Sequence, residues 1–238
     1  MDPEALAAEI DATLRSLGEP VRAEQERRYL KSEIEHYGVR VPAVRAVARR
    51  VRREQPGLDH DALTELAVTL WEVPVHERRV AAVELLAFAP DLLTPADMGL
   101  VERLVRESRT WALVDGLAPW VVGPLVERDV VAAAELDRWA TDEDFWIRRS
   151  ALLALLVPLR KGGGDFDRFG RYADAMLEEK EFFVRKAIGW VLRDTARKRP
   201  DLVYDWLLPR AHRASGVTLR EAVKPLSDDQ RQAVLAAR

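Results

Sequence analysis

A tryptophan and an aspartate four residues apart are the first candidates for chemistry in this sequence. Trp111 and Asp115 lie in the segment Ser-Arg-Thr-Trp-Ala-Leu-Val-Asp, and residues at this spacing share one face of a helix. The sequence has no Gly-x-Ser-x-Gly motif, no cysteine and no Gly-x-Gly-x-x-Gly loop, so an indole and a carboxylate remain as reactive groups. A simpler interpretation also fits the spacing: Trp111 packs in a groove wall, and Asp115 pairs with a nearby arginine.

The segment 181–193 carries a second set of candidates on a helix whose faces differ. Its apolar residues recur at helical spacing and form one stripe, made of Phe183, Val184, Ala187, Ile188, Val191 and Leu192. Lys186 and Arg193 fall on another face, and Trp190 lies between them at the edge of the stripe. Cations beside a half-exposed indole suit a nucleic-acid backbone. A core helix with a solvated basic side would give the same pattern.

We expect no cofactor and no metal. The chain has 238 residues and no cysteine, which excludes disulfides, thiolate zinc sites and iron–sulfur clusters. The four histidines, His36, His60, His76 and His212, are scattered, with no pair at the helical spacing that places two imidazoles on one metal. The glycines at 162–164 lack the strand and the Lys-Ser/Thr of a phosphate-binding loop, and we expect a turn there.

Composition and charge limit where the protein acts. The first residues lack the basic and apolar parts of a secretory signal, and no apolar run reaches the roughly 18 residues that span a bilayer. We therefore expect a cytoplasmic protein without membrane contact. The net charge of −3 is unevenly distributed: the first twenty residues are acidic, whereas 40–53 and 186–199 are rich in Arg and Lys.

Almost every segment is expected to be helical, because Ala, Leu, Arg and Glu dominate, glycine is sparse, and prolines gather at boundaries. No strand is predicted, and 1–238 is expected to form a single domain. The predicted helices are 3–17, 21–35, 42–54, 59–71, 76–88, 95–107, 109–117, 120–127, 130–140, 144–158, 166–178, 182–198, 200–208, 217–224 and 228–237.

Two of these helices begin with the same motif. The segment 144–149 (Asp-Phe-Trp-Ile-Arg-Arg) aligns with 181–186 (Glu-Phe-Phe-Val-Arg-Lys) at an offset of 37 residues. Helix pairs that recur at roughly 35 to 45 residues indicate an all-α solenoid of the HEAT or armadillo kind. Stacked pairs curve and present a concave groove lined by the second helix of each pair, in which Arg149 and Lys186 take equivalent places. An ordinary helix bundle is the structural alternative.

Together these motifs resemble the AlkD group of DNA alkylation repair glycosylases, which are HEAT-like repeat proteins. The resemblance lies in Trp111-x-x-x-Asp115, in 145–149 and above all in 181–193. Further matches follow in the same order along the chain, at 29–31, 38–42, 70–74 with Glu77, and 219–222. The resemblance covers essentially the whole chain, and Arg40 and Thr110 depart from the family's pattern.

The resemblance implies excision of cationic N3- or N7-alkylated purines from double-stranded DNA. A monomer is expected for this architecture, in the bacterial cytoplasm. Trp111, Asp115 and Trp190 would form the catalytic cluster, with Arg149 contacting DNA beside them. An alkylated purine leaves without added protonation, so one carboxylate suffices. The sugar becomes oxocarbenium-like; a carboxylate stabilises it, and each indole face contributes about 0.5 to 2 kcal/mol. The resemblance also implies that the lesion stays in the base stack instead of being flipped.

The remaining groove residues are expected to bind the DNA backbone. This set comprises Tyr29, Arg40, Arg45, Arg49, Arg148, Lys186 and Arg193. Arg45, Arg49 and Arg52 share one helix face, where they could position phosphates without reading sequence or could equally be a solvated face. Two other functions remain open: a HEAT-type protein-binding scaffold, whose groove would be apolar or complementary to acids, and a DNA-binding relative that has lost catalysis.

Overall fold

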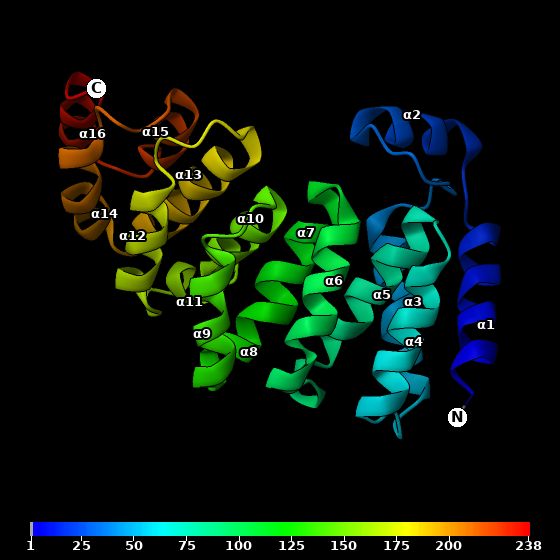
Figure 1. Cartoon of the computed structure of the whole chain (residues 1–238). Coiled ribbons are helices and arrows are strands. Elements are labelled where there is room, and N and C mark those ends of the chain that lie inside the picture. Colours follow the sequence, from blue (N-terminus) through cyan, green and yellow to red (C-terminus); the bar gives the residue numbers. More distant parts are fainter. Residues whose placement is uncertain (1) are drawn as a thin grey trace.

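The computed structural model describes residues 2–238, and helices dominate throughout this range (Figure 1). Over these residues, extended chain pairs only at an isolated bridge between Glu35 and Val75. The prediction of an all-α fold without strands is confirmed. Between residues 2 and 238, no helix has the length and apolar character that crossing a bilayer requires.

The elements follow one another along the chain with short connections. Their bounds are α1 (Pro3–Ser16), α2 (Pro20–Leu30), α3 (Val41–Glu54), α4 (His60–Glu72), α5 (His76–Phe88), η1 (Pro90–Leu92), η2 (Pro95–Asp97), α6 (Met98–Ser108), α7 (Trp111–Leu117), η3 (Ala118–Val122), α8 (Gly123–Arg128), α9 (Val130–Trp139), α10 (Phe145–Leu153), α11 (Leu156–Arg160), α12 (Phe166–Ala175), α13 (Phe182–Ala196), α14 (Pro200–Leu207), η4 (Leu208–Arg210), α15 (Gly216–Ala222) and α16 (Asp228–Ala236).

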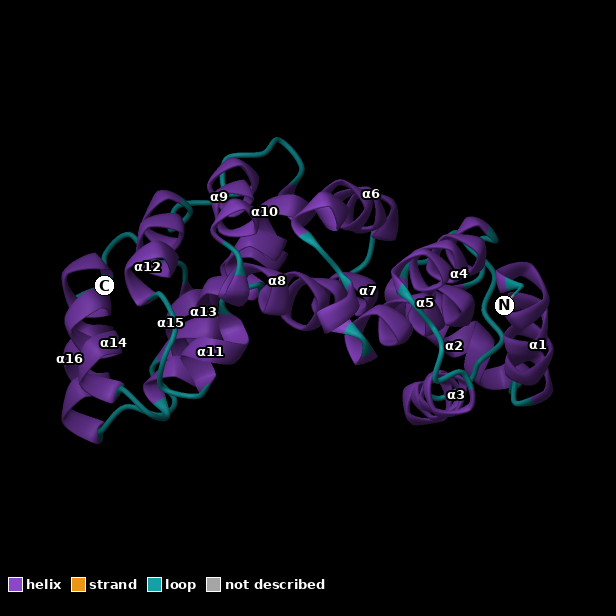
Figure 2. Cartoon of the chain, turned by 90° about the horizontal axis from the view of Figure 1, so that it is seen from below, coloured by secondary structure: helices purple, strands orange, loops and turns teal. Residues whose placement is uncertain are grey.

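The helices stack in two rows. One row is formed by α3, α5, α7, α10, α13 and α15, and from α5 onward each helix packs on the next. The other row includes α4, α6 and α9, which lie along the opposite edge of the molecule in Figure 2. Buried apolar side chains form one connected core that extends from Leu6 to Val234. This is the predicted stack of helical repeats.

Polar contacts between neighbouring repeats span the interval that the sequence motif predicts. The indole N–H of Trp71 donates to Glu107 at 2.8 Å, across 36 residues of sequence. The indole N–H of Trp139 donates to Glu102 at 3.1 Å, across 37 residues. Because each contact joins one repeat to the next, the stability of the array depends on a series of nearest-neighbour interfaces.

The repeated motif begins α10 and α13, which pack against each other. Asp144 caps α10 by accepting the backbone N–H of Trp146 at 2.8 Å, and Glu181 occupies the same position before α13. The apolar stripe predicted for α13 is buried from Val184 to Leu192, whereas Lys186 is exposed. The two faces predicted for this helix are therefore confirmed.

Two predicted helices differ clearly from the structure, one ending early and one dividing. The helix predicted at 21–35 stops at Leu30, because Lys31 adopts a left-handed conformation with φ 51° and the N–H of Ser32 turns back to the carbonyl of Arg27. Glycine usually occupies this capping position, so a lysine there does not mark the end of a helix in the sequence pattern. The helix predicted at 144–158 divides into α10 and α11, because Pro158 has no N–H to donate to the carbonyl four residues earlier.

A third difference concerns the segments predicted at 109–117 and 120–127. Arg109 is left-handed, with φ 47°, and it ends α6. Thr110 then caps α7 by accepting the N–H of Ala112 at 3.3 Å. From Trp111 the chain stays helical through η3, a π-helical stretch, into α8. The two predicted helices are therefore one continuous rod that changes pitch in the middle.

The loop between α2 and α3 is held by a single buried carboxylate at the start of α5. Glu77 is 1% exposed and accepts the backbone N–H groups of Tyr37, Gly38 and Val39 at 2.9, 2.6 and 3.0 Å. Gly38 has φ 81°, and a Cβ there would come within 2.3 Å of the carbonyl of Glu19. Glycine is therefore required at this turn.

Replacing Glu77 with alanine should destabilise the fold by about 3 kcal/mol, because it leaves three buried N–H groups without their charged acceptor. Urea denaturation followed by circular dichroism measures this change. Glu72→Ala, at an exposed position near the end of α4, is the matched control and should change the free energy of unfolding by less than about 0.5 kcal/mol. Equal stabilities of the two variants would contradict the assigned role of Glu77.

Candidate functional site

An ion pair between Asp115 on α7 and Arg149 on α10 lies at the centre of the site. Arg149 Nε donates to Asp115 Oδ1 at 2.9 Å, and Nη2 donates to Oδ2 at 2.8 Å. The third nitrogen, Nη1, donates to the carbonyl oxygen of Phe183 on α13. One planar guanidinium thus joins three successive helices of the row. It makes a bidentate contact with the carboxylate on α7 and a single contact with the backbone of α13.

This geometry gives Arg149, predicted to contact DNA, a role in holding Asp115. The residue is 1% exposed, and its guanidinium is occupied by Asp115 and Phe183. A phosphate could reach it only by displacing the carboxylate, which would leave Asp115 buried without its counter-ion. Arg149 therefore positions Asp115, and its contact with DNA stays a prediction. The pairing of Asp115 with an arginine, offered above as the simpler interpretation, is present in the structure.

Arg148, also predicted to contact DNA, is engaged by protein groups in the structure. Its Nη2 donates to the carboxylate of Glu179 at 2.7 Å, and its Nη1 donates to the carbonyls of Asp142 and Glu143 at 2.6 and 2.8 Å. The side chain is 16% exposed. Its charge is used to hold the loops that precede α10 and α13.

The backbone changes pitch directly after Asp115. Pro119 is the residue whose N–H would complete the helical turn from the carbonyl of Asp115, and proline has no N–H to donate. The chain passes through the π-helical stretch Ala118–Val122 at this point. Such stretches are frequent at functional sites because they reorient the neighbouring side chains.

The carboxylate of Asp115 keeps one edge open, with 19% of the side chain exposed. Burial raises the pKa of Asp115 above its ordinary value, and the positive charges of Arg149 and Lys186 oppose that rise. The proton affinity of this group is therefore set by two opposing effects, loss of solvent and a fixed cation.

The open edge faces a hollow of about 560 Å³ between the ends of several helices. Its lining residues are Tyr29, Trp111, Asp115, Arg149, Phe182, Phe183, Lys186, Trp190, Arg193 and Glu221. In Figure 1, α2 lies on one side of this region and α15 on the other, with α7, α10 and α13 between them. The structure thus places Trp190 of α13 in the same hollow as Trp111 and Asp115 of α7, which lie far from it in the sequence.

Both indoles are held in place by neighbours. Tyr29 lies edge-on to Trp111, with ring centroids 6.1 Å apart and planes at 86°. The indole N–H of Trp190 donates to Asp194 Oδ2 at 3.1 Å, and Arg160 pairs with the same oxygen at 2.7 Å. Asp194 is 3% exposed, so this contact fixes the orientation of the Trp190 ring.

The exposed face of α13 combines aromatic and basic groups. Lys186 Nζ lies 5.8 Å from the ring centre of Phe182, which is 51% exposed. Arg193 donates to Glu221 and to Asp194, so part of its charge is already paired. Phe182 was missed as a site residue, although its spacing of four residues from Lys186 and eight from Trp190 places it on the same helix face.

The other predicted DNA-contacting residues occupy different positions. Arg45 and Arg49 line a second hollow, which shares Tyr29, Trp111 and Asp115 with the first. Arg45 makes a bidentate pair with Glu84 at 2.7 and 2.8 Å, whereas Arg49 is exposed and its Cζ lies 5.3 Å from the ring centre of Phe88. Arg40 is exposed just before α3 and lies 3.7 Å from Glu19.

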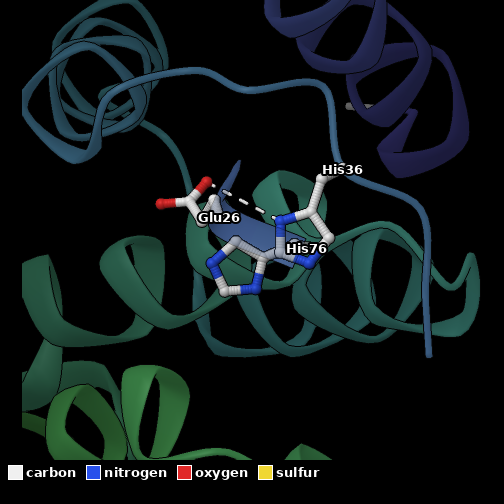
Figure 3. Close-up of side chains that lie close together, drawn as sticks. All are labelled: Glu26, His36 and His76. Carbon is white, nitrogen blue, oxygen red and sulfur yellow. Dashed lines mark ion pairs between the residues drawn. The ribbon is translucent and has the colours of Figure 1, made fainter. Parts of the chain in front are cut away.

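Two of the four histidines, which are scattered in the sequence, lie together in the fold. His36 and His76 stack with ring centroids 4.5 Å apart, and Glu26 lies beside them (Figure 3). They are 40 residues apart in the sequence, and the bridge between Glu35 and Val75 brings their backbones together. Because this contact joins a loop to a helix, helical spacing gave no sign of it.

The family follows from a comparison of the sequence with protein-family models. The model described as "DNA alkylation repair enzyme" matches residues 10–226. The chain belongs to this DNA alkylation repair enzyme family. Asp115, Trp111 and Trp190 all lie within the matched residues. No curated protein sequence matches the chain.

Solved structures share the fold of this DNA alkylation repair family member. A predicted DNA alkylation repair enzyme from Enterococcus faecalis superposes with a TM-score of 0.73 at 22% identity, covering 89% of this chain and 97% of that one. Smu.31 from Streptococcus mutans UA159 gives 0.61 at 19% identity, covering 79% and 98%. AlkD2 from Streptococcus mutans gives 0.60 at 20% identity, covering 76% and 88%. At these identities the likeness establishes the fold alone.

The opposing effects on Asp115 can be separated by removing Arg149. We expect the carboxyl carbon of Asp115 to titrate above 3.8, the ordinary aspartate pKa, and to titrate higher still in Arg149→Met. The reason is that loss of the neighbouring cation favours the neutral acid. Carbon-13 NMR of labelled protein measures both midpoints.

The matched control for this titration is Arg148→Met, which removes the adjacent arginine in the sequence but leaves the Asp115 pair intact. Its Asp115 midpoint should equal that of the wild type. A midpoint in Arg149→Met that is equal to or below the wild-type value would show that Arg149 does not stabilise the carboxylate.

Proposed function

We propose that this DNA alkylation repair family member is a glycosylase that hydrolyses the N-glycosidic bond of cationic N3- or N7-alkylated purines in duplex DNA. The observation that supports this most is the Asp115 carboxylate, held by Arg149 at the edge of a hollow that also contains Trp111 and Trp190. A fixed anion beside two aromatic rings suits a site where positive charge develops on a bound sugar.

The chemistry needs few groups because the substrate is already activated. When the bond from C1′ to the alkylated purine breaks, its electron pair neutralises the charge on the base, which leaves without a proton donor. The positive charge moves to the deoxyribose, where Asp115 and the indole faces stabilise it. Water then adds to C1′, and the carboxylate accepts the proton that the water releases. No cofactor takes part in this scheme.

The lining of the hollow supports binding through the DNA backbone. Tyr29 is 73% exposed and Phe182 is 51% exposed, so flat aromatic surfaces are presented to the outside. Lys186 is exposed beside them, and Arg49 extends the basic surface towards α3. We infer that the sugar and its phosphates approach this face while the lesion stays in the base stack. A protein-binding scaffold is less well supported, because it has no need of an arginine-paired carboxylate beside two indoles.

The remaining parts of the proposal concern the protein as a whole. We infer that it acts as a single-domain monomer, built of HEAT-like repeats, in the cytoplasm. The connected core from Leu6 to Val234 supports one domain. Asp115 and Trp111 of α7 and Trp190 of α13 come from one chain, which supports a site that a monomer can complete.

Substituting Asp115 tests the proposal. Asp115→Asn should slow release of N7-methylguanine from methylated duplex DNA about 10²-fold, because it removes one preorganised charge from the site. Single-turnover assays of base release, without added metal, measure the rate. Asp229→Asn, at an exposed position on α16, is the control and should match the wild type. Absence of release by the wild type would refute the glycosylase proposal, and an unchanged rate in Asp115→Asn would remove Asp115 from the mechanism.

The two cations of α13 should contribute unequally to DNA binding. Lys186→Ala should weaken binding and reduce the slope of log affinity against log salt by about 1, the value for one phosphate contact. Arg193→Ala should have a smaller effect, because Arg193 is already paired with Glu221 and Asp194. Fluorescence anisotropy across a salt series measures both. Lys161→Ala, at an exposed position outside the hollow, should bind as the wild type does; equal effects of all three would place the DNA elsewhere.

A further inference from the structure

A cluster of metal-ligating side chains lies beside the helix that carries Tyr29. Glu26 comes from α2, His36 from the loop before α3, and His76 is the first residue of α5 (Figure 3). One potential ligand atom from each side chain lies within 4.8 Å of the other two. His36 Nδ1 is 3.6 Å from Glu26 Oε2. The cluster is not used in the proposed excision chemistry.

Several polar atoms of the cluster are buried without a partner. Among residues 2–238, no hydrogen-bond partner is present for either ring nitrogen of His36 or for Glu26 Oε2. The side chain of His36 is 1% exposed, so solvent does not supply the missing contacts. Buried nitrogen and oxygen atoms are normally satisfied, because leaving them without partners is unfavourable. Of these three atoms, His36 Nδ1 and Glu26 Oε2 face each other across 3.6 Å, whereas His36 Nε2 lies on the other side of its ring. The unsatisfied pair indicates that a cation can bind between them.

The backbone holds these ligands close to one another. The N–H of His76 donates to the carbonyl of Glu35 at 2.9 Å, which places His36 next to His76. Glu77 fixes the residues that follow His36 through its three backbone contacts. Arg22 Nη2 donates to Glu26 Oε1 at 3.3 Å and leaves Oε2 directed to the histidines. Such outer contacts orient the ligands of metal sites.

We propose that Glu26, His36 and His76 bind a divalent transition metal of the zinc class, with water as the fourth ligand. Two imidazoles and one carboxylate form a ligand set that zinc prefers, and tetrahedral coordination leaves one position for water. The rings are now nearly parallel, at 10°, and each nitrogen lone pair lies in its own ring plane. Metal binding therefore has to turn one ring so that both lone pairs converge.

The metal would anchor α2 to the rest of the array. None of the α2 residues Pro20–Leu30 is buried, and α2 lies apart from the two rows in Figure 1. Glu26 is thus a link between this helix and α5 that does not depend on apolar packing. Tyr29 follows Glu26 by three residues and so lies on a neighbouring part of the same face, where it contacts Trp111. Occupancy of the cluster would hold Tyr29 against the hollow.

Zinc binding by the full chain tests this proposal without reference to excision. After equilibrium dialysis against Zn²⁺, elemental analysis should find one zinc ion per chain in the wild type, and His36→Gln and His76→Gln should lose it. His60→Gln and His212→Gln remove the two histidines outside the cluster and should retain it. Cobalt substitution should give the strong visible absorption of a tetrahedral site. A chain that binds no zinc, or one that loses it equally in all four variants, would overturn the proposal.

Hydrogen exchange provides a readout that does not depend on the variants folding equally well. Zn²⁺ should slow amide exchange in α2 of the wild type and of His60→Gln at least several-fold, and should leave exchange in α16 unchanged. If the cluster takes up only a proton, Zn²⁺ will not alter α2 exchange in the wild type, and the metal site is refuted. Glu26→Gln, which keeps the shape of the side chain but weakens the ligand, should reduce the effect.

Discussion

The pairing of Arg149 with Asp115 is the interaction on which the rest of the site depends. A carboxylate taken out of water needs a fixed counter-charge, and a guanidinium meets it with two parallel hydrogen bonds. The remaining nitrogen of Arg149 reaches the backbone at Phe183, so the same residue sets the spacing of α7, α10 and α13. Displacing α7 or α10 would separate the ion pair, and displacing α13 would break the contact with Phe183. Chemistry and architecture are therefore linked through one buried side chain.

The repeat array explains how a site can be assembled from distant segments. Trp111 and Trp190 are on helices that do not follow one another in sequence, yet both line one hollow. Stacking at an interval of about 36 residues brings equivalent helix positions side by side. The two residues at the aligned position of the repeated motif have different environments. Arg149 is buried and holds a carboxylate, whereas Lys186 is exposed.

The sequence predicted the features that depend on local periodicity, and it could not predict those that depend on contacts between helices. The apolar stripe of α13 and the offset between the two motifs were correct because both are properties of neighbouring residues. The burial of Arg149 depends on Asp115, 34 residues away, and the stacking of His36 on His76 depends on a bridge across a loop. Lys31 and Pro158 show a second limit. A lysine cap ends one helix, and a proline interrupts another, at places where the sequence pattern predicted a continuous helix.

The central claim is that Asp115 stabilises positive charge on a deoxyribose. A duplex that carries a cationic pyrrolidine in place of one sugar imitates that charge, and transition-state mimics bind more tightly than neutral analogues. The most direct measurement compares its affinity with that of a duplex carrying a neutral tetrahydrofuran, for wild type and Asp115→Asn. We predict a clear preference for the cationic duplex in the wild type that disappears in the variant. Equal affinities in the wild type, or a preference that persists in Asp115→Asn, would contradict this account.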